Sequence, residues 1–276
     1  MKNNILLPTD FSENAWSATE YATKLFANED CNFYFLHASQ PPSGRISVSS
    51  TKLARVMAEN DLKSLSEFKT KAEKTFPNSK HKFNILLSQN DLFDAIEVTL
   101  SQHGIDLVIM GTKGASRSED LFFGSNTVNV IKRIKSSAVL MIPDGFNFVK
   151  PKQIAFPTDF NRSYGKEIEY VKQMCGLYKA KISVVHISDN LELSEAQHEQ
   201  QKVLESVLEH IPHSFNSVLD SGKKEHAIKD FIEEHDIDIL AMIYYTHSFL
   251  EYVTKEPVIK RIGFQPTIPF LVIPKA

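Results

Sequence analysis

Four segments of the sequence occur twice in the same order, and this internal repeat constrains the fold more than any other feature. The pairs are ILLPTDFSENA and IAFPTDFNRSY, GIDLVIMG and DIDILAMI, NVIKRI and PVIKRI, and AVLMIP and FLVIP. The spacing between copies is far longer than a solenoid unit, so the pattern indicates a duplicated domain. We predict two domains, residues 1–146 and 147–276, with the segment DGFNFVKPK as a short linker at the boundary.

Each half alternates short apolar runs with amphipathic segments, which predicts a parallel sheet covered by helices on both faces. In the first half we expect strands at NILLP, CNFYFLHA, KFNILLSQ, IDLVIM and AVLMI, with helices between them. Asp10 or Ser12 can cap the first helix. Asp91 can cap the third helix, and Gly104 suits its carboxyl end.

Charge, cysteine content and hydropathy exclude several classes of protein. A net charge of -3 gives no electrostatic reason to expect nucleic acid or an anionic membrane as a partner. Cys31 and Cys175 lie far apart without metal-ligand spacing, so we expect two buried thiols rather than a disulfide or a zinc site. The first residues lack a signal-peptide core, and no apolar run approaches a membrane span, so we expect a cytoplasmic protein.

A glycine-containing loop follows the fourth predicted strand of the first half. It has the form G-x2-G-x9-G-S, with Gly111, Gly114, Gly124 and Ser125 at the fixed positions. Glycines let a ligand approach the backbone amides, and the amino terminus of the next helix favours a phosphate group. Lys113 and Arg117 add positive charge to the same loop. The loop is not a Walker A motif, because no Gly-Lys-Ser/Thr sequence occurs in the chain.

With PTDF, this loop and the segment GSNTVNVIKRI, the chain resembles a tandem universal stress protein of the ATP-binding branch. The resemblance covers nearly the whole chain. It implies two five-stranded parallel sheets of strand order 3-2-1-4-5, an adenine nucleotide alpha hydrolase-like fold, and the two domains arranged as an intramolecular pseudo-dimer. A homodimer of the chain stays open as the alternative.

The resemblance also implies nucleotide-binding residues in the first domain. Asp10 matches a family position beside the adenosine portion, with Thr9 as a secondary candidate, and Ala38 matches a position whose backbone contacts adenine. The phosphate-binding positions are Gly111, Gly114, Gly124, Ser125 and Asn126, with Lys113 and Arg117 as secondary candidates.

The second half keeps the PTDF segment but lacks the glycines of the loop. Tyr244, Tyr245, His247 and Phe249 place bulky side chains in a shorter connection. We therefore expect one nucleotide site per chain, and for Asp159 we favour a helix-capping role.

The function that these features favour is an adenine-nucleotide-binding stress-response regulator. We expect ATP in the first domain to act as a conformational switch with little or no turnover, and an unidentified protein partner to read the change. A slow ATP hydrolase or nucleotidyl enzyme, or an interaction scaffold that binds no nucleotide, stays open as an alternative. No catalytic residue and no dedicated metal site are expected, and magnesium or manganese would arrive with the phosphates. His37 and His186, at matching strand ends, are interpreted as packed residues.

Overall fold

The computed structural model describes residues 2–39, 48–113, 124–190, 192–220, 224–244 and 267–275. The chain separates into two compact units, Met1–Phe148 and Val149–Ala276, which are described one at a time below.

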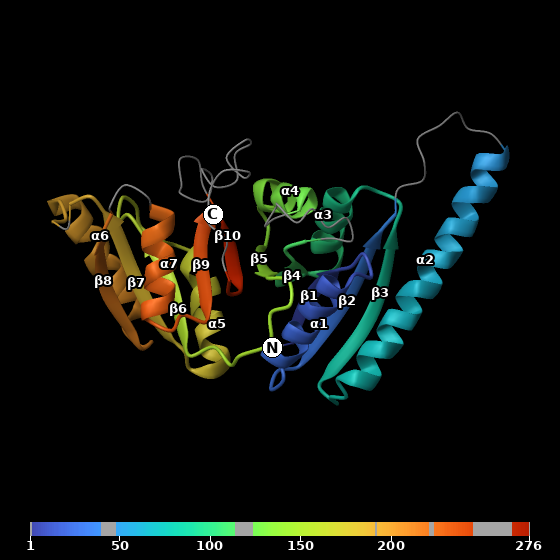
Figure 1. Cartoon of the computed structure of the whole chain (residues 1–276), viewed down its shortest axis with the longest axis horizontal. Coiled ribbons are helices and arrows are strands. Elements are labelled where there is room, and N and C mark those ends of the chain that lie inside the picture. The colour runs from blue at the N-terminus through green and yellow to red at the C-terminus, as the bar shows by residue number, and fades with distance from the viewer. Residues whose placement is uncertain are drawn as a thin grey trace. The chain divides into compact units, whose positions relative to one another are not determined.

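The first unit is a five-stranded parallel sheet in the order β3-β2-β1-β4-β5, as the family resemblance implies (Figure 1). Its strands are β1 (Asn3–Pro8), β2 (Cys31–Ala38), β3 (His81–Ser88), β4 (Leu107–Gly111) and β5 (Ala138–Ile142). Its helices are α1 (Glu13–Leu25), α2 (Val48–Thr75), α3 (Leu92–His103) and α4 (Ser125–Arg133).

The helices of the first unit form two pairs. Trp16 of α1 packs against Phe68 of α2 and against Phe76 just after that helix, with ring centroids 5.3 and 5.5 Å apart. The guanidinium of Arg133 in α4 lies 3.6 Å from the Phe93 ring of α3. Because parallel crossovers are right-handed, a chain that reverses direction after β3 carries these two pairs on opposite faces of the sheet. Strands β4 and β5 are buried throughout.

Local sequence signals set the helix ends of the first unit. Ser12 is the N-cap of α1 and accepts a hydrogen bond from the Ala15 amide, so the cap is Ser12 and not Asp10. Asp91 caps α3 through the Asp94 amide, and Gly104 ends that helix in the left-handed conformation. Both expectations for α3 are confirmed.

The second unit repeats the strand order, as β8-β7-β6-β9-β10. Its strands are β6 (Gln153–Thr158), β7 (Lys181–Ser188), β8 (His213–Leu219), β9 (Ile239–Tyr244) and β10 (Phe270–Pro274). Its helices within the described residues are α5 (Glu167–Tyr178), α6 (Glu195–Leu208) and α7 (Lys224–Glu234). The segment between β9 and β10, where a last helix is expected, lies outside the described residues.

The two cysteines are confirmed as free and buried, one in each unit. In the part of the chain that the structure describes, no helix has the length and apolar character needed to cross a membrane.

Candidate functional site

The strand order of the first unit creates a switch point between β1 and β4. The chain moves outward from β1 to β2 and β3, then returns to place β4 on the other side of β1. In open parallel sheets a ligand binds beyond the carboxyl ends of the strands at such a point.

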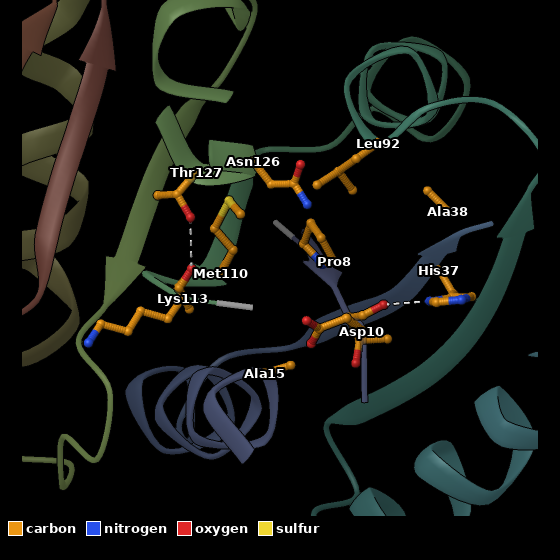
Figure 2. A pocket seen from close by; sticks show the side chains of 12 residues that line it. Pro8, Asp10, Ala15, His37, Ala38, Leu92, Met110, Lys113, Asn126 and Thr127 are labelled. Carbon is orange, nitrogen blue, oxygen red and sulfur yellow. Dashed lines mark hydrogen bonds between the residues drawn. The ribbon is translucent and has the colours of Figure 1, made fainter. Parts of the chain in front are cut away.

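A cavity of about 110 Å³ opens at this switch point (Figure 2). Its walls come from the ends of β1, β2 and β4 and from the first turns of α1, α3 and α4. The lining residues are Pro8, Thr9, Asp10, Ala15, His37, Ala38, Leu92, Met110, Gly111, Lys113, Asn126 and Thr127. Positions 9, 10 and 38 therefore lie close to positions 111, 113, 126 and 127, although they are far apart in the sequence.

The turn after β1 is held by its own side chains. Thr9 Oγ1 accepts a hydrogen bond from the Phe11 amide at 3.0 Å, and Asp10 Oδ1 accepts one from the Ser12 amide at 3.1 Å. Phe11 takes a φ of 65°, a conformation that is uncommon for a bulky residue. These contacts turn the chain sharply into α1 and place the Asp10 carboxylate at the cavity.

His37 connects this turn to β2 and α2. Its Nδ1–H donates to the Thr9 carbonyl at 2.8 Å, and its Nε2 lies 3.9 Å from Asp61 Oδ1. The Phe11 ring packs on the imidazole with centroids 4.5 Å apart. His37 is thus a packed, hydrogen-bonded residue, as expected, and it also lines the cavity beside Ala38.

The other wall is the start of α4. Gly124 is the N-cap of this helix and provides no side-chain hydrogen bond, whereas α1, α3 and α6 are capped by Ser12, Asp91 and Ser194. Ser125 and Asn126 are exposed in its first turn. The amides of an uncapped first turn and the positive end of the helix dipole favour an anion.

Six of the predicted site residues line the one cavity: Thr9, Asp10, Ala38, Gly111, Lys113 and Asn126. Gly124 and Ser125 directly precede Asn126 but are not among the lining residues. Gly114 and Arg117 lie outside the described residues. In Figure 2 the Lys113 ammonium is directed away from Asp10 and Asn126.

Several lining residues were not singled out from the sequence. Leu92 and Met110 are ordinary helix and strand residues, and no pattern distinguishes them. Ala15 could have been predicted from the sequence, because a small residue just after the PTDF turn leaves room at the strand end. Thr127, whose hydroxyl donates to the Thr112 carbonyl at 3.1 Å, joins the two ends of the glycine-containing loop.

The corresponding place in the second unit is filled by a tyrosine. Counted from the shared PTDF segment, Tyr164 holds the position of Ala15 and Thr158 holds that of Thr9. The Tyr164 hydroxyl hydrogen-bonds the Thr158 hydroxyl, and its ring packs on Phe156 with centroids 5.2 Å apart. The side chain therefore lies across the carboxyl end of β6, beside which the first unit leaves its cavity.

Asp159 does not cap the first helix of the second unit, contrary to expectation. Its Oδ1 accepts a hydrogen bond from the Asn161 amide, as Asp10 does with Ser12. The N-cap of α5 is Lys166, because this helix begins several residues later than its counterpart and out of reach of the aspartate.

Among the described residues, no group of three histidine, cysteine, aspartate or glutamate side chains is arranged to hold a metal ion. A metal that accompanied a nucleotide would be held mainly by phosphate oxygens.

A doubly wound parallel sheet with a cavity at its switch point places this protein in the α/β class. The particular family follows from comparison: residues 1–143 match the universal stress protein family, and the chain belongs to it. Comparison with curated proteins gave no match.

Solved structures repeat the architecture along the whole chain. A universal stress protein from Archaeoglobus fulgidus is 20% identical, with a TM-score of 0.66, and the match covers 99% of this chain and 97% of that one. A protein from Pseudomonas aeruginosa, described as a putative universal stress protein, is 14% identical, with a TM-score of 0.57 and coverage of 99% and 93%.

A third similar structure is the cytoplasmic domain of a prokaryotic cation chloride cotransporter. It is 10% identical, with a TM-score of 0.57 and coverage of 99% and 95%. At such identities the likeness concerns the fold alone, so the function of this chain has to be argued from its site.

Proposed function

We propose that this chain is an adenine-nucleotide-binding regulatory protein that holds ATP in its first unit and changes conformation with little or no turnover. The observation that carries the proposal is the cavity at the switch point. There Asp10 and Ala38, at the ends of β1 and β2, lie close to Gly111 and Asn126, at the end of β4 and the start of α4.

The two ends of the cavity suit the two ends of a nucleotide. Small and apolar side chains, such as Pro8, Ala38 and Leu92, give a flat base room to enter. The exposed Asp10 carboxylate is an acceptor suited to the hydroxyls of a ribose. Ligand pockets usually measure about 300–1,000 Å³. A cavity of about 110 Å³ therefore takes only part of the ligand, and we assign it to adenosine.

The phosphates are proposed to lie along the start of α4. This first turn has no side-chain cap and carries the exposed Ser125 hydroxyl. The Gly124 amide itself donates to the Thr112 carbonyl at 2.8 Å, so the amides offered to phosphate are those after Gly124. Lys113 would have to reorient its side chain to pair with a phosphate.

One nucleotide per chain is proposed, because bulkier residues stand at the matching positions of the second unit. Tyr164 replaces Ala15, and Ile243 replaces Gly111 at the matching strand end. Both changes add side-chain volume where a ligand would have to approach the backbone.

A switch fits the described pocket better than an efficient enzyme does. A good ATPase needs a group that orients water and groups that stabilise the transferred phosphoryl. Asp10 is the carboxylate among the described lining residues, and one of its oxygens is engaged by the Ser12 amide. Glu119 and Asp120 lie outside the described residues, so slow hydrolysis or nucleotidyl transfer remains the second candidate.

The main test is ATP binding to the full chain by isothermal titration calorimetry, with Asp10→Asn and Asp159→Asn as a matched pair. Both aspartates accept the same hydrogen bond in the same turn, and asparagine keeps that acceptor. We expect one site in the wild type. Losing a charged acceptor costs about 1.5–3 kcal/mol, so Asp10→Asn should bind roughly 10- to 100-fold more weakly. Asp159→Asn should bind like the wild type.

Two equivalent ATP sites, or equal effects of the two substitutions, would contradict the proposal. Mass spectrometry of the native protein for co-purified nucleotide separates the regulator from a scaffold that binds none. Steady-state turnover separates the regulator from an enzyme, since ordinary enzymes turn over at about 1 s⁻¹ or faster.

A further inference from the structure

Asn14 is a buried polar side chain in the first turn of α1, close to the cavity but not among its lining residues. Only 3% of it is exposed. Its Oδ1 accepts a hydrogen bond at 2.9 Å from the backbone amide of Lys113, which lies 99 residues further along the chain. A side chain of the first helix thus holds the backbone just after β4.

Gly111 is the residue that lets Asn14 reach this position. A Cβ added to Gly111 would lie 2.1 Å from Asn14 Oδ1 and 2.5 Å from its Cγ, closer than real Cβ atoms approach other atoms. Gly111 does not have a positive φ, so its backbone conformation does not require glycine. The absent side chain therefore makes room for Asn14, and the two residues act as a pair.

Two further hydrogen bonds join the two ends of the glycine-containing loop. The Thr112 carbonyl accepts from the Gly124 amide at 2.8 Å and from the Thr127 hydroxyl at 3.1 Å. With the Asn14–Lys113 bond, these contacts form what we call the loop base: Asn14, Thr112, Lys113, Gly124 and Thr127. The loop base fixes where α4 begins relative to the end of β4.

The second unit has lost both members of the pair. Counted from the PTDF segment, Ser163 stands in place of Asn14, and the aligned strand end has Ile243 in place of Gly111. Ser163 is exposed, whereas Asn14 is buried. Strand β9 continues to Tyr244, which pairs with Pro274, whereas β4 ends one position earlier, at Gly111 opposite Ile142. Where the Asn–Gly pair is missing, the strand thus runs one residue further.

We infer that Asn14 is a positioning residue for the phosphate end of the nucleotide site. It acts through the loop base, by holding the backbone between β4 and α4, and it does not have to touch the ligand. Among the described residues its Nδ2 has no hydrogen-bond partner, which costs stability when a donor is buried. A purely stabilising role would not explain the choice of asparagine. The inference rests on the proposed function, since it concerns the same site.

The first experiment compares ATP with adenosine as ligands of the full-length Asn14→Ala protein. A residue that sets only the phosphate end should affect ATP and spare adenosine. We expect ATP affinity to fall about ten-fold, the effect of one hydrogen bond, and adenosine affinity to change by less than about two-fold. Ser163→Ala, at the matching position of the second unit, should change neither. Asn14→Ser replaces the alanine variant if that one does not fold.

The second experiment tests the pair without any ligand, by thermal unfolding of Asn14→Ala, Gly111→Ala and the double variant. Gly111→Ala should lower the melting temperature, because its Cβ collides with the Asn14 side chain. In the Asn14→Ala background the same change should lower it by less, because the Oδ1 and Cγ atoms are gone. Such non-additivity is the sign of direct coupling.

The outcomes separate this inference from the proposed function. If the wild type binds no ATP, both fail together. If the wild type binds ATP and Asn14→Ala binds it equally well, or loses ATP and adenosine in equal measure, this inference alone is overturned. Additive melting shifts would overturn the Asn14–Gly111 pairing on which it stands.

Discussion

The two units of this chain share a strand order and a turn sequence, but they differ in the side chains around the turn, beside which the first unit has its cavity. Thr9 and Asp10 in the first unit make the same backbone hydrogen bonds as Thr158 and Asp159 in the second. Phe11 and Phe160 both take a positive φ. The PTDF segment therefore forms the same turn at the end of the first strand in both units.

What distinguishes the units is side-chain volume at a few positions around that turn. Ala15 leaves space in the first unit, whereas Tyr164 at the matching position of the second packs on Phe156 and bonds Thr158. We propose that the second unit has lost its ligand and kept its fold, because Tyr164 adds packing where the ligand's contacts would be. The following predictions test this contrast.

The largest effect is expected from Tyr164→Ala, which gives the second unit the residue of the first. Tyr164 is 8% exposed and packs on Phe156. Truncating a large buried aromatic residue typically costs about 3–5 kcal/mol. Urea unfolding monitored in the second unit should show a loss of this order. A loss below about 1 kcal/mol would mean that the tyrosine does not fill the crevice.

The next effect uses the two cysteines as reporters, one in each unit. Burial raises the pKa of both the Cys31 and the Cys175 thiols to about 12, so neither should react with a thiol reagent until its unit opens. ATP at 100 times its dissociation constant stabilises the binding unit by about 2.7 kcal/mol. Labelling of Cys31 should slow about 100-fold, and labelling of Cys175 should not change. Equal protection of both thiols would contradict a single site in the first unit.

A smaller effect is expected from Tyr164→Phe, which keeps the ring and removes the hydroxyl. The Thr158 hydroxyl loses its tyrosine partner, and such a hydrogen bond contributes about 1 kcal/mol. The unfolding free energy should fall by that amount, well below the loss in Tyr164→Ala. If the two variants were equally destabilised, the hydroxyl and not the ring would hold the second unit closed.

The smallest effect is a pH dependence confined to the first unit. Burial lowers the pKa of His81 below its ordinary value, although its hydrogen bond to the Phe26 carbonyl opposes the shift. The unfolded chain therefore binds this proton more readily, and the stability that neutral His81 contributes is lost as the pH falls below about 6.5. The slope should not exceed one proton, about 1.4 kcal/mol per pH unit. Urea unfolding of wild type and His81→Gln between pH 7.5 and 5.5 measures it, and identical slopes would refute it.

How the two units associate remains a prediction of the family resemblance. We expect them to form a pseudo-dimer within one chain, with a homodimer as the alternative. Native mass spectrometry gives the number of chains per particle.

The sequence by itself determined the features that depend on neighbours along the chain. The repeat, the alternation of strands and helices, the Asp91 cap and the Gly104 helix end are readable because each involves residues a few positions apart. Where local reading was wrong, as for Asp159, a later helix start moved the helix amides out of reach.

Only the tertiary structure decided what the glycines and the small residues are for. From the sequence, Gly111 is one of several glycines that could admit a phosphate; in the fold its bare Cα admits the side chain of Asn14. The roles of Ala15 and Tyr164, lining a cavity and packing on a strand end, depend on the fold. These contacts join residues whose distance apart is set by the folded sheet, and local sequence patterns do not encode that distance.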